Sequence, residues 1–236
     1  MGFTLAEVLI TLGVIGVVAA MTIPTLFANY QKKVYVTQLK KAYSVANQAL
    51  LKLEVDMGCT GDLQCTGLFG TNYIISSQKF GDEFVKQFKI SNNCQLTSEK
   101  SCWSTDQSQN YNRIGSGGFD GNSDPSLYRF TTADGQAFAI LAYDGGNCEQ
   151  HDSSCGELRI DVKGPNKGPN NWGRDIFIFE ILSKKGIVAP QLPDDTFCSA
   201  ANPEGVFCAA RIMNEGWEMN YDNPPYIAPA PPPAST

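Results

Sequence analysis

The sequence predicts an α+β fold in which one long N-terminal helix packs against an antiparallel β-sheet domain. Three observations predict it: an apolar run over residues 3–26, apolar residues at helical spacing over residues 29–57, and short β-prone segments between residues 127 and 182. The chain has 236 residues, which is long enough for one membrane anchor and one domain of ordinary size.

The first element is the apolar run, in which Glu7 is the only ionisable side chain. As a helix, residues 3–26 would be about 36 Å long, enough to cross a bilayer core of roughly 30 Å. A carboxylate in such a span is costly unless it is paired, so Glu7 is predicted to be functional. The alternative is a glutamate close enough to the helix end to reach the lipid headgroups.

The same helix is expected to continue through residues 27–57, with Gly58 as its stop. Its buried side is predicted by an apolar stripe at Val34, Leu39, Tyr43, Ala46, Leu50, Leu53 and Met57. Pro24 lies inside the helix, where it removes a hydrogen bond and favours a kink or local melting.

The rest of the domain is expected to begin with loops over residues 58–126, interrupted by a short helix at 82–88. Residues 127–132 and 136–143 read as strands joined by the tight turn Ala133-Asp134-Gly135, and 158–162 and 176–182 as two further strands. Residues 203–216 are expected to form a short helix, with Asn202 as its cap and Gly216 as its stop. The proline-rich residues 224–236 are expected to be a disordered tail.

All eight cysteines follow the apolar run and fall into four close pairs along the chain. An even count in an exported domain indicates disulfides, and we expect the sequential set among 105 possible connectivities. A zinc site is disfavoured because no pair is CxxC and His151 is the single histidine. The expected pairs are Cys59–Cys65, Cys94–Cys102, Cys148–Cys155 and Cys198–Cys208.

The charge distribution argues against nucleic acid as a partner. Residues 1–57 hold five lysines against Glu7, Glu54 and Asp56, a net charge of +2, while the remainder holds 13 basic and 21 acidic residues, a net charge of −8. An acidic domain lacks the basic surface that general DNA binding needs. With one histidine and no visible nucleophile-and-base set, we expect no enzymatic activity.

Residues 2–10, Gly-Phe-Thr-Leu-Ala-Glu-Val-Leu-Ile, resemble the processing signature of type IV pilins and type II secretion pseudopilins. The resemblance implies that a prepilin peptidase cuts between Gly2 and Phe3 and methylates the new amino terminus of Phe3. It makes Glu7 the fifth mature residue, whose carboxylate would meet the Phe3 amine of a neighbouring subunit. It also implies that Pro24 can let the helix extend in a fibre, and that the fold is one long helix on an antiparallel sheet.

The resemblance divides the chain into a leader remnant (1–2), a transmembrane part of the helix (3–26), an amphipathic part (27–57), a disulfide-rich domain (58–223) and the tail (224–236). It implies a single-pass protein of the bacterial inner membrane with its C-terminal domain in the periplasm, which later enters a periplasmic or extracellular fibre. Because family leaders carry basic residues and only Met1 precedes Gly2 here, we expect further basic residues upstream.

The expected function is a structural subunit of a type IV pilus or a type II secretion pseudopilus. Its partners would be other pilin or pseudopilin subunits, the prepilin peptidase, the inner-membrane assembly platform and membrane lipid. The alternative is a minor tip subunit that acts as an adhesin or as a DNA-uptake binding module. Abundance along the fibre separates the two, since a tip subunit is scarce.

No cofactor is expected, with calcium as the one alternative. The segment from Asp161 to Asp175 links two strands, and Asp161, Asn166, Asn170 and Asp175 supply oxygens of the kind that calcium prefers. It resembles a loop of pseudopilins, some of which bind calcium near the sheet. Lys163 would then have to point into solvent, so a turn that satisfies its own backbone is the favoured interpretation.

Overall fold

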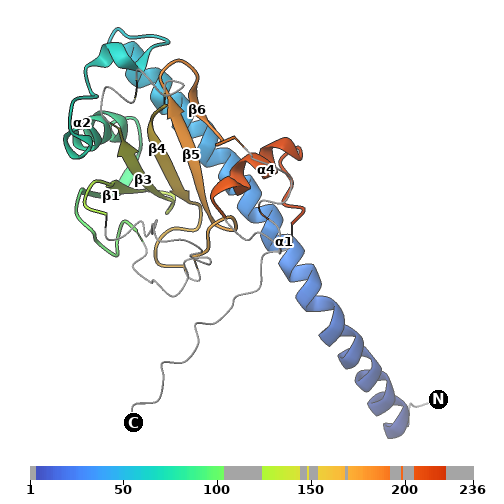
Figure 1. Ribbon diagram of the computed structural model, residues 1–236. Helices are drawn as coiled ribbons and strands as arrows, with labels where there is room; N and C mark the ends of the chain where they lie inside the picture. The colour runs from blue at the N-terminus through green and yellow to red at the C-terminus, as the bar shows by residue number, and fades with distance from the viewer. Residues whose placement is uncertain are drawn as a thin grey trace, which may run out of the picture.

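The computed structural model describes residues 4–103, 124–143, 148, 154–167, 170–191, 198 and 205–221. One long helix, α1 (Leu5–Asp56), passes along the domain and extends beyond it, so that its N-terminal part projects into the surroundings (Figure 1). The expected tail, residues 224–236, lies outside the described residues.

Helix α1 begins and ends with regular caps. Thr4 is its N-cap, and Gly58 follows its last turn with a φ of +70°. The amides of Gly58 and Cys59 donate to the carbonyls of Val55 and Glu54, which is the hydrogen-bond pattern of a Schellman motif. Gly58 is therefore the stop that the sequence predicted, because its conformation is one that glycine adopts without steric cost.

The helix continues without a break through Pro24, so the expected local melting is not present in this structure. The hydroxyls of Thr22 and Thr25, on either side, donate to the carbonyls of Val18 and Thr22 at 3.0 and 2.9 Å. Such back-bonding supplies local donors in a segment where proline supplies none.

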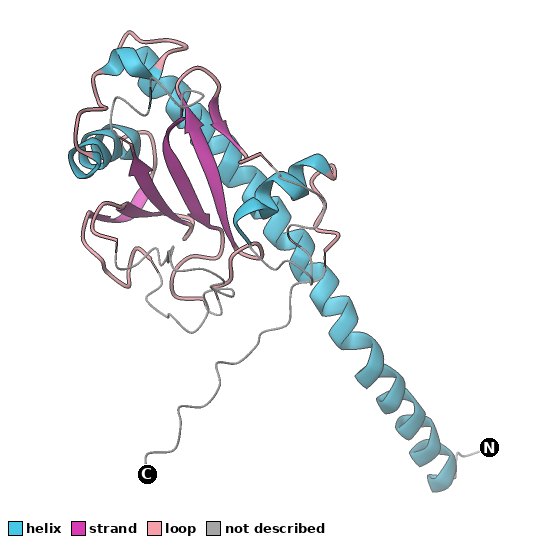
Figure 2. Ribbon diagram, viewed as in Figure 1, coloured by secondary structure: helices cyan, strands magenta, loops and turns pink. Residues whose placement is uncertain are grey.

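The sheet is a six-stranded antiparallel meander in which every strand pairs with its neighbours in sequence. Figure 2 shows its strands in magenta beside the long helix α1. The expected strands and the turn at residues 133–135 are confirmed, and β4 begins earlier than expected. The strands are β1 (Ile90–Gln95), β2 (Tyr128–Thr132), β3 (Ala137–Ala142), β4 (Ser154–Asp161), β5 (Ile176–Leu182) and β6 (Gly186–Val188).

The two edge strands were not expected. Strand β1 has the sequence ISNNCQ, pairs with β2 through two register shifts and buries only Cys94. Strand β6 has three residues. Polar, irregular and short edges are common in natural sheets because they discourage pairing with another chain.

The short helix expected at residues 82–88 is wrong in its bounds, because α2 spans Tyr73–Val85. The side chain of Asn72 caps it by accepting from the amides of Ile74 and Ile75. Packing sets its position, since a Cβ on Gly81 would lie 2.2 Å from the ring of Tyr128 on the sheet. A 3-10 turn, η1 (Leu63–Thr66), precedes it.

The helix expected over residues 203–216 is shorter than predicted. A 3-10 turn, η3 (Gly205–Phe207), leads directly into α4 (Cys208–Asn214), whose N-cap is Phe207. Asn202 is therefore not the cap of this helix, and it lies outside the described residues. Gly216 is the stop as expected, with a φ of +74°.

Both faces of the sheet are covered, and both faces of β5 carry apolar side chains. Phe177 and Phe179 face the main core, which α1, α2 and α4 complete, while Ile176 and Ile178 join a smaller cluster around Trp172. From α1 the main core takes Tyr35, Val36, Leu39, Ala42, Ala46, Ala49, Leu50 and Leu53.

The eight cysteines form four disulfides in the expected sequential pairing, Cys59–Cys65, Cys94–Cys102, Cys148–Cys155 and Cys198–Cys208. In each bridge the two cysteines are at most ten positions apart in the chain. They therefore secure local turns around the sheet rather than distant parts of the chain.

Candidate functional site

The first candidate site is the N-terminal end of α1, where Glu7 caps its own helix. Its Oε2 accepts from the amide of Thr4 at 2.9 Å and from the Thr4 hydroxyl at 2.8 Å. The Thr4 hydroxyl oxygen in turn accepts from the amide of Glu7 at 3.3 Å. This capping box places a negative charge at the positive end of the helix.

The expected processing residues Gly2 and Phe3 lie outside the described residues. The structure therefore describes the carboxylate that the sequence predicted as functional, but not its expected partner.

The helix behind Glu7 is an apolar arm, defined here as residues 5–30 of α1. Its large apolar side chains are exposed, from Leu5 at 79% to Tyr30 at 63%. Its best 18-residue window has a mean hydropathy of 2.2 and packs against no other part of the described chain. By length and composition, α1 is able to cross a membrane.

The second candidate site is the loop between β4 and β5, where calcium was the alternative expectation. Asp161 and Asp175 are both buried, but Lys163 does not point into solvent. Its ammonium lies 2.7 Å from Oδ2 of Asp175, and its side chain is only 13% exposed. The condition for a calcium site is therefore not met, because a protein cation stands beside the carboxylate.

One oxygen of each aspartate binds the backbone of the loop itself. Oδ1 of Asp161 accepts from the amides of Lys163 and Gly164 at 3.0 and 2.9 Å, and Oδ1 of Asp175 accepts from the amide of Asn171 at 2.6 Å. These are the contacts of Asx-type turns.

The two amides of the expected ligand set lie in different surroundings. Asn166 is exposed, whereas Asn170 is buried and donates to the carbonyl of Pro165 at 3.4 Å. Among the described residues, no group of three or more histidine, cysteine, aspartate and glutamate side chains is placed to hold a metal ion. The loop is thus described best as an Asx-type turn with an internal ion pair.

Burial raises the pKa of one carboxyl group of this loop to near neutral pH. Desolvation raises the pKa of Asp161 to about 7, and the nearby charge of Asp175 acts in the same direction. Desolvation also raises the pKa of Asp175, against the opposing effect of Lys163.

The same loop contacts α1 through two cations. Lys163 and Arg174 both lie over the ring of Tyr35, with cations 5.7 and 5.9 Å from its centroid. The loop is therefore docked on α1 just beyond the arm.

Sequence reasoning missed a third feature, a groove between α1 and the segment that follows α4. It is lined by Lys32 and Lys33 on one side and by residues 217–220 on the other. Lys32 donates to the carbonyl of Tyr221, 189 positions away in the chain. No local pattern in a sequence signals a contact of that separation.

In comparisons with known proteins, the chain matches no protein-family model, no curated protein and no solved structure.

Proposed function

We propose that this chain is a pilin-like structural subunit, cut between Gly2 and Phe3 by a prepilin peptidase and assembled through the apolar arm into a type IV pilus or a type II secretion pseudopilus. The observation that carries the proposal is the arm itself. It presents apolar side chains on every side, and Glu7 is its only charged residue.

Such a surface needs an apolar environment. Contiguous exposed apolar patches on soluble proteins rarely exceed a few hundred Å², and larger ones mark sites of interaction with proteins or membranes. Before assembly the bilayer would cover the arm, with the domain on the periplasmic side of the inner membrane. In the fibre the arms of neighbouring subunits would cover one another.

Glu7 would set the register of that packing. Its two hydrogen bonds from Thr4 end on the same oxygen, Oε2. A carboxylate offers about four acceptor sites, so its other oxygen can accept a donor from a neighbouring subunit without breaking either bond. The donor in this proposal is the methylated amine of Phe3, and pairing the two charges avoids leaving either one unpaired in an apolar bundle.

The experiment separates the charge of Glu7 from its capping role. Glu7→Gln keeps an acceptor for the capping box but removes the charge, Glu7→Ala removes both, and Thr4→Val removes only the cap. Because the charge is what pairs between subunits, fibre yield should fall to background for both Glu7 variants and stay near the unmutated level for Thr4→Val.

The matched readout is the thermal unfolding of the domain, which should be unchanged in all three variants because residues 4 and 7 are exposed at the far end of the arm. Normal fibre yield from Glu7→Gln would refute the assembly role. A loss with Thr4→Val equal to that with Glu7→Gln would assign the effect to helix capping instead.

A further inference from the structure

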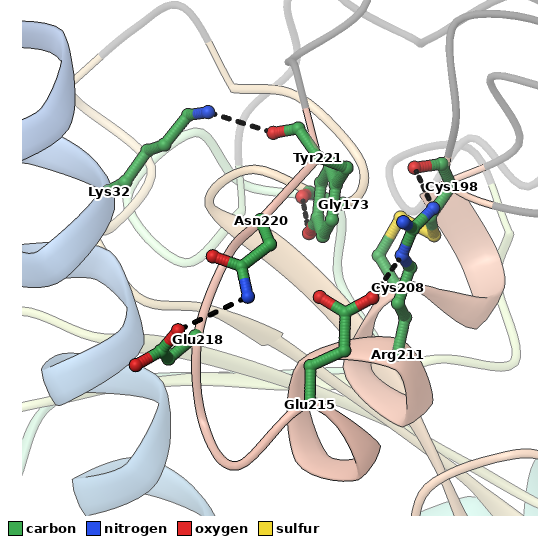
Figure 3. Close-up of polar contacts among 9 residues, drawn as sticks. All are labelled: Lys32, Gly173, Cys198, Cys208, Arg211, Glu215, Glu218, Asn220 and Tyr221. Atoms are coloured by element: carbon green, nitrogen blue, oxygen red, sulfur yellow. Dashed lines mark hydrogen bonds and ion pairs between the residues drawn. A yellow bond between two sulfur atoms is a disulfide. The ribbon is translucent and has the colours of Figure 1, made fainter.

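The groove between α1 and the segment after α4 is built from both ends of the chain. It encloses about 540 Å³ and lies where Lys32 and Lys33 face Trp217, Glu218 and Asn220. Figure 3 shows the ammonium of Lys32 directed from α1 toward the carbonyl of Tyr221, at 2.8 Å.

The wall opposite α1 is held in place by several contacts. The hydroxyl of Tyr221 donates to the carbonyl of Gly173, and Arg211 joins Glu215 at 2.8 Å and the carbonyl of Cys198 at 3.1 Å (Figure 3). The Cys198–Cys208 disulfide lies beside them. The groove is thus formed before any ligand arrives.

Trp217 is fixed in an unusual conformation. Its φ is +66°, a value that bulky side chains rarely adopt. Its ring packs 5.8 Å from that of Tyr43, and the ammonium of Lys40 lies 5.6 Å from its centroid. The fold therefore holds an indole against α1 at the cost of local backbone strain.

The position of the groove along α1 is its most informative property. The apolar run ends at Leu26, and Lys32 follows six residues later, about 9 Å further along the helix. The headgroup layer on each side of a bilayer is roughly 5–8 Å thick. Figure 1 places α4 at the end of the domain from which the arm projects. If the arm crosses a membrane with Leu26 at the boundary of the hydrocarbon core, the groove lies at the outer edge of the headgroup layer, and long lysine side chains there can reach back to the lipid phosphates.

We propose that the groove binds the phosphate of an anionic phospholipid in the leaflet on the side of the domain. Of the described residues that line the groove, Lys32 and Lys33 are basic and Glu218 is acidic, and the Glu218 carboxylate accepts from the side-chain amide of Asn220 at 3.2 Å. A tryptophan beside lysines at the end of an apolar helix is the arrangement that membrane–water interfaces favour. The inference rests on the proposed membrane insertion of the arm.

The test uses the full chain in detergent micelles, titrated with phosphatidylglycerol or phosphatidylcholine and monitored by native mass spectrometry. Lys33→Gln is the main variant because Lys33 is exposed, and Lys52→Gln is its control, with the same charge change at the far end of α1. We expect phosphatidylglycerol to bind in preference, Lys33→Gln to weaken it about fivefold and Glu218→Gln to strengthen it, with Lys52→Gln near the unmutated affinity.

Several outcomes would overturn the inference. Equal weakening by Lys33→Gln and Lys52→Gln would indicate only general charge attraction. Displacement of the lipid by millimolar inorganic phosphate would indicate a site for free anions, and a second copy of the chain bound in place of lipid would indicate a subunit interface. Sedimentation with phosphatidylcholine vesicles separates the two proposals: a chain that fails to insert contradicts both, whereas one that inserts without lipid selectivity contradicts this inference alone.

Discussion

The two halves of α1 are one continuous helix with opposite surroundings. In the arm, Leu12 is 61% exposed, whereas Leu39 in the second half is fully buried against the sheet. The first half is apolar all round, and the second alternates a buried stripe with exposed lysines. Secondary structure is thus the same on both sides of residue 30, and only the partner differs.

This difference shows that the two halves of α1 depend on different interactions. The second half is held by packing within the chain, so its residues determine whether the domain folds. The arm contributes nothing to that core, so its sequence is free to serve an external partner. Mutation of Glu7 should therefore reduce fibre assembly, whereas mutation of Leu39 should reduce the stability of the domain.

The largest expected effect on stability is in the packed half. Leu39→Ala should lower the free energy of unfolding by about 2–5 kcal/mol, because it removes buried methyl groups and leaves a cavity. Leu12→Ala, the same change in the arm, should alter it by less than about 0.5 kcal/mol. Urea unfolding of the full chain in detergent measures both. Equal losses would break the distinction between the two halves.

The loop docked on Tyr35 should make the packed half sensitive to pH. Asp161 holds its proton to about pH 7 in the folded state but only to about pH 4 when unfolded, so stability should fall as pH rises through that interval, by at most about 1.4 kcal/mol per unit. Asp161→Asn keeps an oxygen for the amides of Lys163 and Gly164 and should flatten the slope. A smaller slope of the same sign should remain from Asp175, whose pKa is also raised.

Urea unfolding at several pH values between 4 and 8 provides the measurement. Stability that rises with pH in the unmutated protein would contradict the assignment, and so would an unchanged slope in Asp161→Asn.

Disulfide loss should weaken the domain and leave the arm unaffected. Replacing Cys94 and Cys102 together by serine opens a loop of sequence separation 8 and should cost about 2–3 kcal/mol. Insertion of the arm into vesicles should not change. Thermal melting measures the stability of the domain, and vesicle sedimentation of the same sample measures insertion of the arm. Loss of both stability and insertion would show that insertion depends on the folded domain.

The smallest expected effect is that of calcium. Because Lys163 already neutralises Asp175, millimolar calcium should not shift the melting temperature of the domain. A rise that Asp161→Ala and Asp175→Ala each abolish would contradict this and would place a calcium site in the loop.

The features that the sequence predicted correctly have local causes. The stripe at Leu39, Ala46, Leu50 and Leu53 follows helical periodicity, and its outlying member Met57 is exposed at the helix end. Strands β2 and β3 are short β-prone segments on either side of the turn at Gly135, and Gly58 and Gly216 stop helices through a conformation that other residues resist.

The features that were missed depend on tertiary contacts. Helix α2 begins with Tyr-Ile-Ile-Ser-Ser, residues of weak helix propensity, and burial of Phe80 and Phe84 outweighs that preference. The polar strand β1 pairs only because β2 offers it an edge. The groove at Lys32 arises between segments far apart in the chain, and Lys163 turns inward to pair with Asp175 while it lies over Tyr35 of α1. No local sequence pattern indicates either arrangement.

The most direct test of the account is the mass of the N-terminal peptide from assembled fibres. The account predicts a peptide that begins at Phe3 with a methylated amine, because only a cut after Gly2 creates the charge that Glu7 would meet in the apolar bundle. Fibres whose subunits retain Met1 and Gly2 would contradict it, since the arm would then assemble without that amine.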